Sequence, residues 1–229
     1  MVLAAKVFAV KEERNLPLVA SKLKDFRLEQ EVRVEGDSFN LLSEITDLDI
    51  SKEYLEGTFA FDSVFQVKQH GKVISVLKTY EAPFAFDIFG KSTFLSIFDK
   101  KNRANNIANE MSKALFMSLG QIVEGRIQPE TLKRFHEENF EETKILFFDD
   151  IDLPNISKLS LYGDGLGATK LYNDYLGHGK IWYAVVKSAK YGYVVGVTRS
   201  CVVTVFSRTE LPEFKRYVKN EILPLITEA

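Results

Sequence analysis

Alternation of apolar and polar positions dominates the first part of the chain. Residues 27–35 place apolar side chains on one parity and charged ones on the other, and residues 58–69 place Phe59, Phe61 and Phe65 on one parity. A period of two is typical of a half-buried strand. The same signals, bounded by turn residues such as His70-Gly71, predict further strands over residues 39–47, 72–80, 83–89 and 93–98.

A helical period follows these strands. Apolar residues recur at i, i+3 and i+4 over residues 104–118, while charged and amide residues take the other face, which predicts an amphipathic helix. A shorter stripe predicts a helix within residues 16–26. Later in the chain we expect helices from Pro129, over 168–176 and from Leu211, and strands over 144–148, 158–162, 180–188, 193–198 and 201–206.

A faint internal repeat links the two parts. Residues 71–115 align with residues 179–223, and each segment reads as strands followed by an amphipathic helix. We therefore predict an α+β protein of antiparallel meanders covered by helices, with two similar halves at 1–120 and 121–229 packed as one compact unit. Convergence of two strand–helix units explains the repeat as well as duplication does.

The predicted core follows from these periods. Its members are large apolar residues at the inward positions of strands and helices, namely Phe59, Phe61, Ile97, Phe98, Ile107, Met111, Trp182, Val203, Val205, Phe206, Phe214 and Val218.

Composition narrows the class of protein. The chain has 229 residues, 45% of them hydrophobic, and 30 basic against 32 acidic residues, so bulk charge does not indicate a polyanion ligand. Cys201 is the single cysteine, which excludes an intrachain disulfide, and we expect it to be a small buried hydrophobe. Residues 1–10 are interrupted by Lys6 and predict a strand, and no apolar stretch is long enough to span a bilayer. We expect a soluble, cytoplasmic protein without membrane association.

A glycine-rich loop is the first candidate site. It lies between a predicted strand and a predicted helix, where backbone amides can bind phosphate, and its candidate ligands are Gly163, Asp164, Gly165, Gly167, Thr169 and Lys170. The loop matches neither the Walker A pattern nor the dinucleotide-binding pattern. A structural turn explains it equally well.

An acidic run is the second candidate site. Asp149, Asp150 and Asp152 follow an apolar strand and are residue types that hold a hard cation such as magnesium. The alternative is a solvated strand end. If the run met the glycine-rich loop, the two would form one metal-dependent phosphate site.

Other catalytic signatures are missing. His70 and His178 lie beside glycines in predicted turns, His136 falls on a charged helix face, and no Gly-x-Ser-x-Gly sequence occurs. The sequence thus predicts no catalytic residue and no cofactor.

Basic and aromatic residues of the second half form the third candidate site. Cations beside aromatic rings can bind and stack nucleic acid, and those in question are Lys187, Lys190, Tyr191, Tyr193, Arg199, Lys215 and Arg216. A solvated charged face is the plainer explanation. We expect a non-enzymatic binding or regulatory protein that acts through a protein partner or as a homodimer. Nucleic-acid binding and a divalent-metal-dependent enzyme acting on a phosphate-containing substrate are the alternatives.

Overall fold

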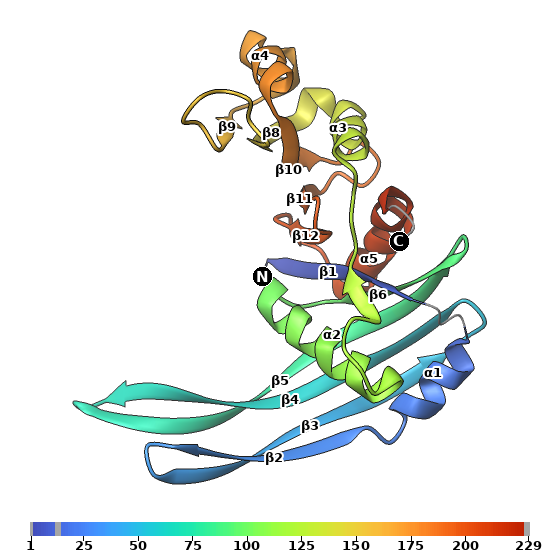
Figure 1. Ribbon diagram of the computed structural model, residues 1–229, viewed down its shortest axis with the longest axis vertical. Coiled ribbons are helices and arrows are strands. Elements are labelled where there is room, and N and C mark those ends of the chain that lie inside the picture. The colour runs from blue at the N-terminus through green and yellow to red at the C-terminus, as the bar shows by residue number, and fades with distance from the viewer. Residues whose placement is uncertain (1, 12–14, 227–229) are drawn as a thin grey trace. The chain divides into compact units, whose positions relative to one another are not determined.

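The computed structural model describes residues 2–11 and 15–226, which form an α+β protein with antiparallel strands and five α-helices (Figure 1). The chain divides into two compact units. The N-terminal unit contains residues 10–98 and 102–122, and the C-terminal unit contains residues up to 9, residues 99–101 and those from 123 onward. No helix in the described residues is long and apolar enough to cross a bilayer.

The N-terminal unit is built on an antiparallel meander. Its strands lie in chain order, namely β2 (Arg27–Val34), β3 (Asp37–Ile50), β4 (Tyr54–Gln69), β5 (Lys72–Phe89) and β6 (Ser92–Ile97). Two-residue turns at Glu35-Gly36 and His70-Gly71 have positive φ at both positions, as type I′ hairpin turns require. The turn predicted at His70-Gly71 is confirmed.

β5 is longer than the sequence predicts, because it continues through Pro83. The carbonyl oxygen of Pro83 accepts a hydrogen bond from the Phe98 N–H at 2.8 Å. In an antiparallel pair, the N–H and C=O of one residue point to the same neighbour. The missing N–H of Pro83 therefore faces away from β4, and the long β4–β5 ladder loses no hydrogen bond.

Two helices cover part of this meander. α1 (Leu16–Leu23) starts where the Asn15 side chain accepts a hydrogen bond from the Leu18 N–H, and α2 (Lys101–Phe116) buries the stripe that the sequence predicts. The Lys22 ammonium donates to the Leu115 carbonyl oxygen at 2.8 Å and joins the two helices. Arg103 of α2 lies 4.8 Å from the centre of the Tyr80 ring on β5.

The C-terminal unit has a second antiparallel arrangement of strands. Its order is β1 (Leu3–Val10), β12 (Val202–Val205), β11 (Val194–Thr198), β10 (Lys180–Lys187), β8 (Thr143–Asp149) and β9 (Leu159–Tyr162), and β7 (Ile122–Glu124) pairs with β1. Its helices are α3 (Pro129–Glu137), α4 (Lys170–His178) and α5 (Leu211–Tyr217), the last continuing as π and 3-10 turns to Leu225. The strand predicted over residues 1–10 is β1, and Met1 lies outside the described residues.

The two repeat segments differ before their last strand. β5 is one strand over residues 72–89, whereas the aligned residues 180–197 contain β10, a turn and most of β11. Both segments then continue with a short strand and a helix, β6 with α2 and β12 with α5. Duplication, with two similar halves, stays a prediction.

Burial agrees with most of the expected core. Nine of the twelve residues are buried, while Phe61 and Trp182 are half-buried. The prediction for Phe206 was wrong, because its side chain is 49% exposed. Val203 and Val205 of β12 point inward, so the next position along an extended chain points outward. Cys201 is fully buried, and burial raises the pKa of its thiol, as expected of a small hydrophobe.

His136 is a second correction. Its side chain is fully buried rather than on a charged helix face, because Leu132, Phe135 and His136 together form the inward stripe of α3. Its Nδ1 lies 2.9 Å from the Thr143 hydroxyl, and its ring packs edge-on to Tyr172 at 5.0 Å. Burial lowers its pKa from 6.5 to about 4, since the imidazolium would be desolvated.

The burial of His136 predicts a pH-dependent stability. Between pH 6.5 and about 4 the unfolded chain binds a proton that the folded chain does not. This group therefore adds stability only above that window and lowers the free energy of unfolding by up to about 1.4 kcal/mol per pH unit as the pH falls through it. We expect the free energy of unfolding of the His136→Asn variant, measured by urea unfolding at a series of pH values, to fall less steeply with decreasing pH in this window than that of the wild type.

His70→Asn provides the control, because His70 occupies an exposed turn in which asparagine tolerates the positive φ. This variant should keep the wild-type dependence of the free energy of unfolding on pH. An equal slope for His136→Asn and the wild type would contradict the prediction.

Candidate functional site

The glycine-rich loop connects β9 with α4. Three of its backbone N–H groups form hydrogen bonds at 3.0–3.1 Å, since Gly163 donates to the Lys144 carbonyl oxygen on β8 and Ala168 and Thr169 donate to carbonyl oxygens within the loop. The Thr169 hydroxyl caps α4 by accepting from the Tyr172 N–H at 3.2 Å. Asp164 pairs with Lys144, and Lys170 is exposed at the first residue of α4.

Packing accounts for one of the loop glycines. A Cβ on Gly167 would overlap the ring of Phe140, far inside van der Waals contact. Gly165 has φ +60, which glycine adopts without strain. These residues thus have structural reasons to be glycine.

The three aspartates are held by different partners. Arg199 pairs with both carboxylate oxygens of Asp149 and approaches Asp150 at 3.5 Å, while Asp152 lies 2.8 Å from Nδ1 of His178. Within residues 2–11 and 15–226, no three His, Cys, Asp or Glu side chains are grouped closely enough to hold a metal ion.

The aspartates and the glycine-rich loop lie at opposite ends of β8. The loop meets Lys144 near the start of the strand, whereas Asp149 is its last residue. Five residues of strand separate these points by about 17 Å. The structure therefore does not bring the two segments together into one phosphate–metal site.

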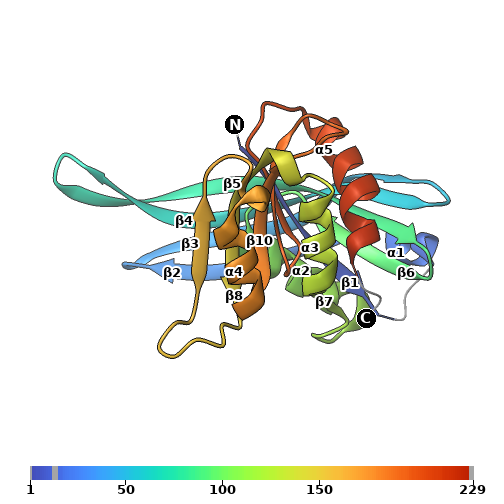
Figure 2. The same cartoon turned by 90° about the horizontal axis from the view of Figure 1, so that it is seen from above.

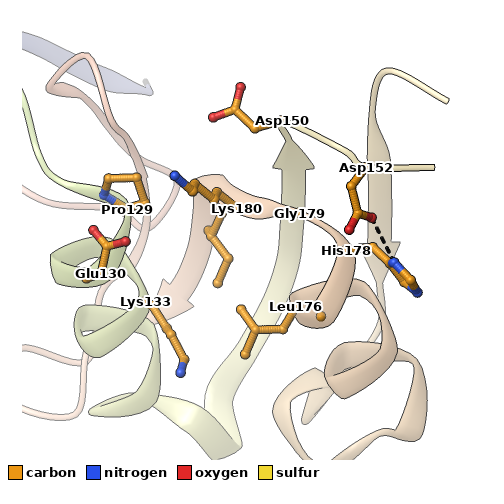
Figure 3. Close-up of a pocket in the computed structure, with 11 residues that line it drawn as sticks. Pro129, Glu130, Lys133, Asp150, Asp152, Leu176, His178, Gly179 and Lys180 are labelled. Atoms are coloured by element: carbon orange, nitrogen blue, oxygen red, sulfur yellow. Dashed lines mark hydrogen bonds and ion pairs between the residues drawn. The ribbon is translucent and has the colours of Figure 1, made fainter. Parts of the chain in front are cut away.

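The hollow beside α3 has a volume of about 440 Å³ and a mixed charge (Figure 3). Glu130 and Lys133 of α3 and Lys180 of β10 lie on one side of it. On the other side, Asp152 and His178 point toward each other. Its charges nearly balance, because Glu130, Asp150 and Asp152 are set against Lys133 and Lys180.

Three of the five basic residues predicted for nucleic acid form ion pairs with carboxylates in the described part of the chain. Lys187 pairs with Glu142 at 3.8 Å, Lys190 pairs with Glu221 at 2.7 Å, and Arg199 pairs with Asp149. Tyr191 and Tyr193 contact each other and the buried ring of Tyr217, which leaves them half-buried. Lys215 is half-buried and Arg216 exposed, both on α5. The structure therefore does not gather these side chains into one open basic surface.

A different feature emerges in the N-terminal unit, where the meander splits into two hairpins. The register between β3 and β4 ends at Ser43 opposite Phe61. Beyond this point β3 pairs with β2, and β4 pairs with β5 down to Gln69 opposite Lys72. The β2–β3 and β4–β5 hairpins end apart from each other (Figure 1), and the view from above shows the same divergence (Figure 2). We call this pair of hairpins the fork.

Asp62 holds the point where the fork opens. Its Oδ2 accepts a hydrogen bond from the Leu42 N–H at 3.0 Å, and its Oδ1 accepts one from the Thr79 hydroxyl at 2.6 Å. Leu42 is the first β3 residue beyond the β3–β4 register. The carboxylate therefore replaces a backbone acceptor at the place where β4 leaves β3.

One face of the fork carries exposed apolar side chains. On the free part of the β4–β5 hairpin, Phe65 lies opposite Val76 and Val67 opposite Ile74, and these four side chains are 37–42% exposed. Strand alternation places them on the same face as the buried Phe59. On the β2–β3 hairpin the pairs on the same face are Val32 opposite Phe39 and Gln30 opposite Leu41. We call this surface the apolar face.

Sequence reasoning missed the fork, although one signal was present. Residues 63–80 contain no aspartate or glutamate and have apolar residues on both sides of the His70-Gly71 turn. The opposite face of the same hairpin also exposes Val73 and Leu77, but on the β2–β3 hairpin that face carries Arg27, Glu29 and Glu31. On β2, apolar side chains therefore occur only on the apolar face.

Comparison with known proteins adds no family, since no family model matches this chain and no curated protein sequence matches it.

The structural role of Gly167 can be tested directly. We expect Gly167→Ala to lower the free energy of unfolding by about 1–3 kcal/mol, because the new methyl group overlaps the Phe140 ring. Gly177→Ala is a matched control within α4, where a Cβ has no atom within 4 Å. That control should be neutral or more stable by up to about 1 kcal/mol. Equal thermal unfolding of the two variants would contradict the packing role.

Proposed function

We propose that this chain is a non-enzymatic binding protein that acts through a protein interface on the apolar face of its fork. The observation that carries the proposal is the set of apolar side chains along one face of β4, from the buried Phe59 through Phe61 to the exposed Phe65 and Val67, interrupted by the Ser63–Lys78 pair. Contiguous exposed apolar surface rimmed by polar residues marks interaction sites in folded proteins.

The free part of the β4–β5 hairpin supports this proposal by its own marginal stability. Residues 62–69 of β4 pair with β5 alone among the described strands. An isolated two-stranded hairpin is barely stable in water, and a third strand or a packed surface is needed to hold it. A partner protein on the apolar face would supply that surface.

The two alternative functions have less support from the geometry. Nucleic-acid binding through the C-terminal unit would require cations that Glu142, Glu221 and Asp149 already neutralise. A metal-dependent enzyme would require convergence of carboxylates that instead pair with Arg199 and His178. Regulatory activity, a cytoplasmic location and descent from a duplicated half remain predictions beside the proposal.

Site-specific photo-cross-linking tests the proposed interface. A photoreactive phenylalanine analogue at Val67, on the apolar face, should give discrete covalent adducts with a protein in the native cells, identified by mass spectrometry. The same analogue at Gln66, which points to the opposite face, should not.

A pair of variants controls for general stickiness. Phe65→Thr with Val76→Thr should abolish the Val67 adducts, since both substitutions remove apolar surface from the apolar face and keep a good strand former. Val73→Thr with Leu77→Thr, on the opposite face, should leave the adducts unchanged. Adducts that are equal at Val67 and Gln66 would overturn the proposal.

A further inference from the structure

The two hairpins of the fork carry opposite charge. The free part of the β4–β5 hairpin, residues 63–79, contains Lys68, Lys72 and Lys78 and no carboxylate, a formal charge of +3 with His70 neutral. The β2–β3 hairpin over residues 27–42 has two arginines and four carboxylates, Glu29, Glu31, Glu35 and Asp37, a formal charge of −2. We call these the basic ribbon and the acidic hairpin.

These charges are exposed and available to another molecule. Lys68 and Lys72 are exposed, and neither forms an ion pair with a carboxylate in the described part of the chain. Glu29 and Glu31 are exposed on the strand at the end of the meander, where Glu29 contacts Arg27 at 3.0 Å and Glu31 accepts a hydrogen bond from Ser38. Exposed contacts of this kind contribute little and are easily exchanged for others.

Within one chain the two hairpins do not neutralise each other. Asp62 holds the split, and the hairpins diverge beyond it (Figure 1 and Figure 2). A second copy of the chain provides both complements at once, because a two-fold axis makes every contact twice.

We propose that the partner at the fork is a second copy of this chain, with the basic ribbon of each copy lying along the acidic hairpin of the other. This inference rests on the proposed function and names its partner. β2 is the edge strand of the meander, so its outer edge offers unpaired backbone groups to an added strand. Adding a ribbon there extends the apolar face across both copies and sets Lys68 on the same face as Glu29 and Glu31.

Self-pairing of β2 in the register centred on Gln30 is disfavoured by its charges. Antiparallel pairing of two β2 strands about Gln30 would set Arg27 opposite Arg33 and Glu29 opposite Glu31, so that like charges meet. The ribbon presents lysines instead. A polyanion fits the fork less well than a second copy does, because the four carboxylates of the acidic hairpin would repel it.

The size of the contact predicts a dissociable dimer. Each contact is a strand edge about 23 Å long, from seven residues of strand. Strand-edge pairing leaves the faces of the sheet open, so two such contacts bury less than the roughly 1,200 Å² at the lower end of stable protein complexes. Association should therefore depend on concentration and weaken as salt screens the charges.

A charge-swap experiment by sedimentation equilibrium tests the proposal. The wild type should form dimers as its concentration rises. Variant Lys68→Glu and variant Glu29→Lys/Glu31→Lys, each alone, should associate at least about tenfold more weakly, a loss of about 1.4 kcal/mol or more. An equimolar mixture of the two variants should regain the wild-type association, because in the mixed dimer both contacts again join opposite charges.

The mixture separates a lost contact from a lost fold, since misfolded variants would not rescue each other. A wild type that stays monomeric at every concentration, or a mixture that stays dissociated, overturns the proposal. Adducts at Val67 with a different protein would sustain the proposed function and overturn the second copy as partner. Binding of an oligonucleotide that the lysine variant loses and the glutamate variant strengthens, without dimers, would assign the basic ribbon to nucleic acid instead.

Discussion

The length of the strands relative to the helices that cover them determines what this chain exposes. β5 has 18 residues and spans about 60 Å, whereas α2 has 16 residues and spans about 24 Å. α1 adds eight residues, which pack on β3 and β4. Two helices of this length bury Phe59 and Phe84 but do not reach Phe65 or Ile74. Because the alternating pattern of β4 continues past the helices, apolar side chains remain on the surface.

Asp62 turns that excess length into two separate hairpins. Without an acceptor at this position, the Leu42 N–H would lose its partner where β4 leaves β3, and an unpaired amide in a sheet is costly. The same carboxylate binds Thr79, so the fork opens at one defined pair of residues rather than fraying. The type I′ turns at Glu35-Gly36 and His70-Gly71 then fix the register of each hairpin to its tip.

Local patterns could predict most of the elements, because strand alternation, turn residues and the stripe of α2 are written in neighbouring residues. The position of the fork could not be predicted, since it depends on which strands stop pairing at Ser43 and Phe61. His136 was misjudged because its charged neighbours suggested an outer face, whereas Leu132 and Phe135 set the inward stripe. The aspartates and the glycine-rich loop are close only in sequence. The aspartates follow the end of β8, whereas the antiparallel strand β9 brings the chain back to the start of β8 before the loop begins.

The location of satisfied charges argues for the fork over the C-terminal unit as the site of binding. In the C-terminal unit, Arg199 is held by Asp149 in a part-buried ion pair that a ligand would have to replace, whereas Lys187 and Lys190 meet carboxylates through exposed contacts. On the basic ribbon, Lys68 and Lys72 have no such competitor in the described part of the chain. Apolar surface and uncompensated charge thus coincide on a hairpin that lacks a supporting strand. A partner there would gain from burial, ion pairing and new backbone hydrogen bonds together.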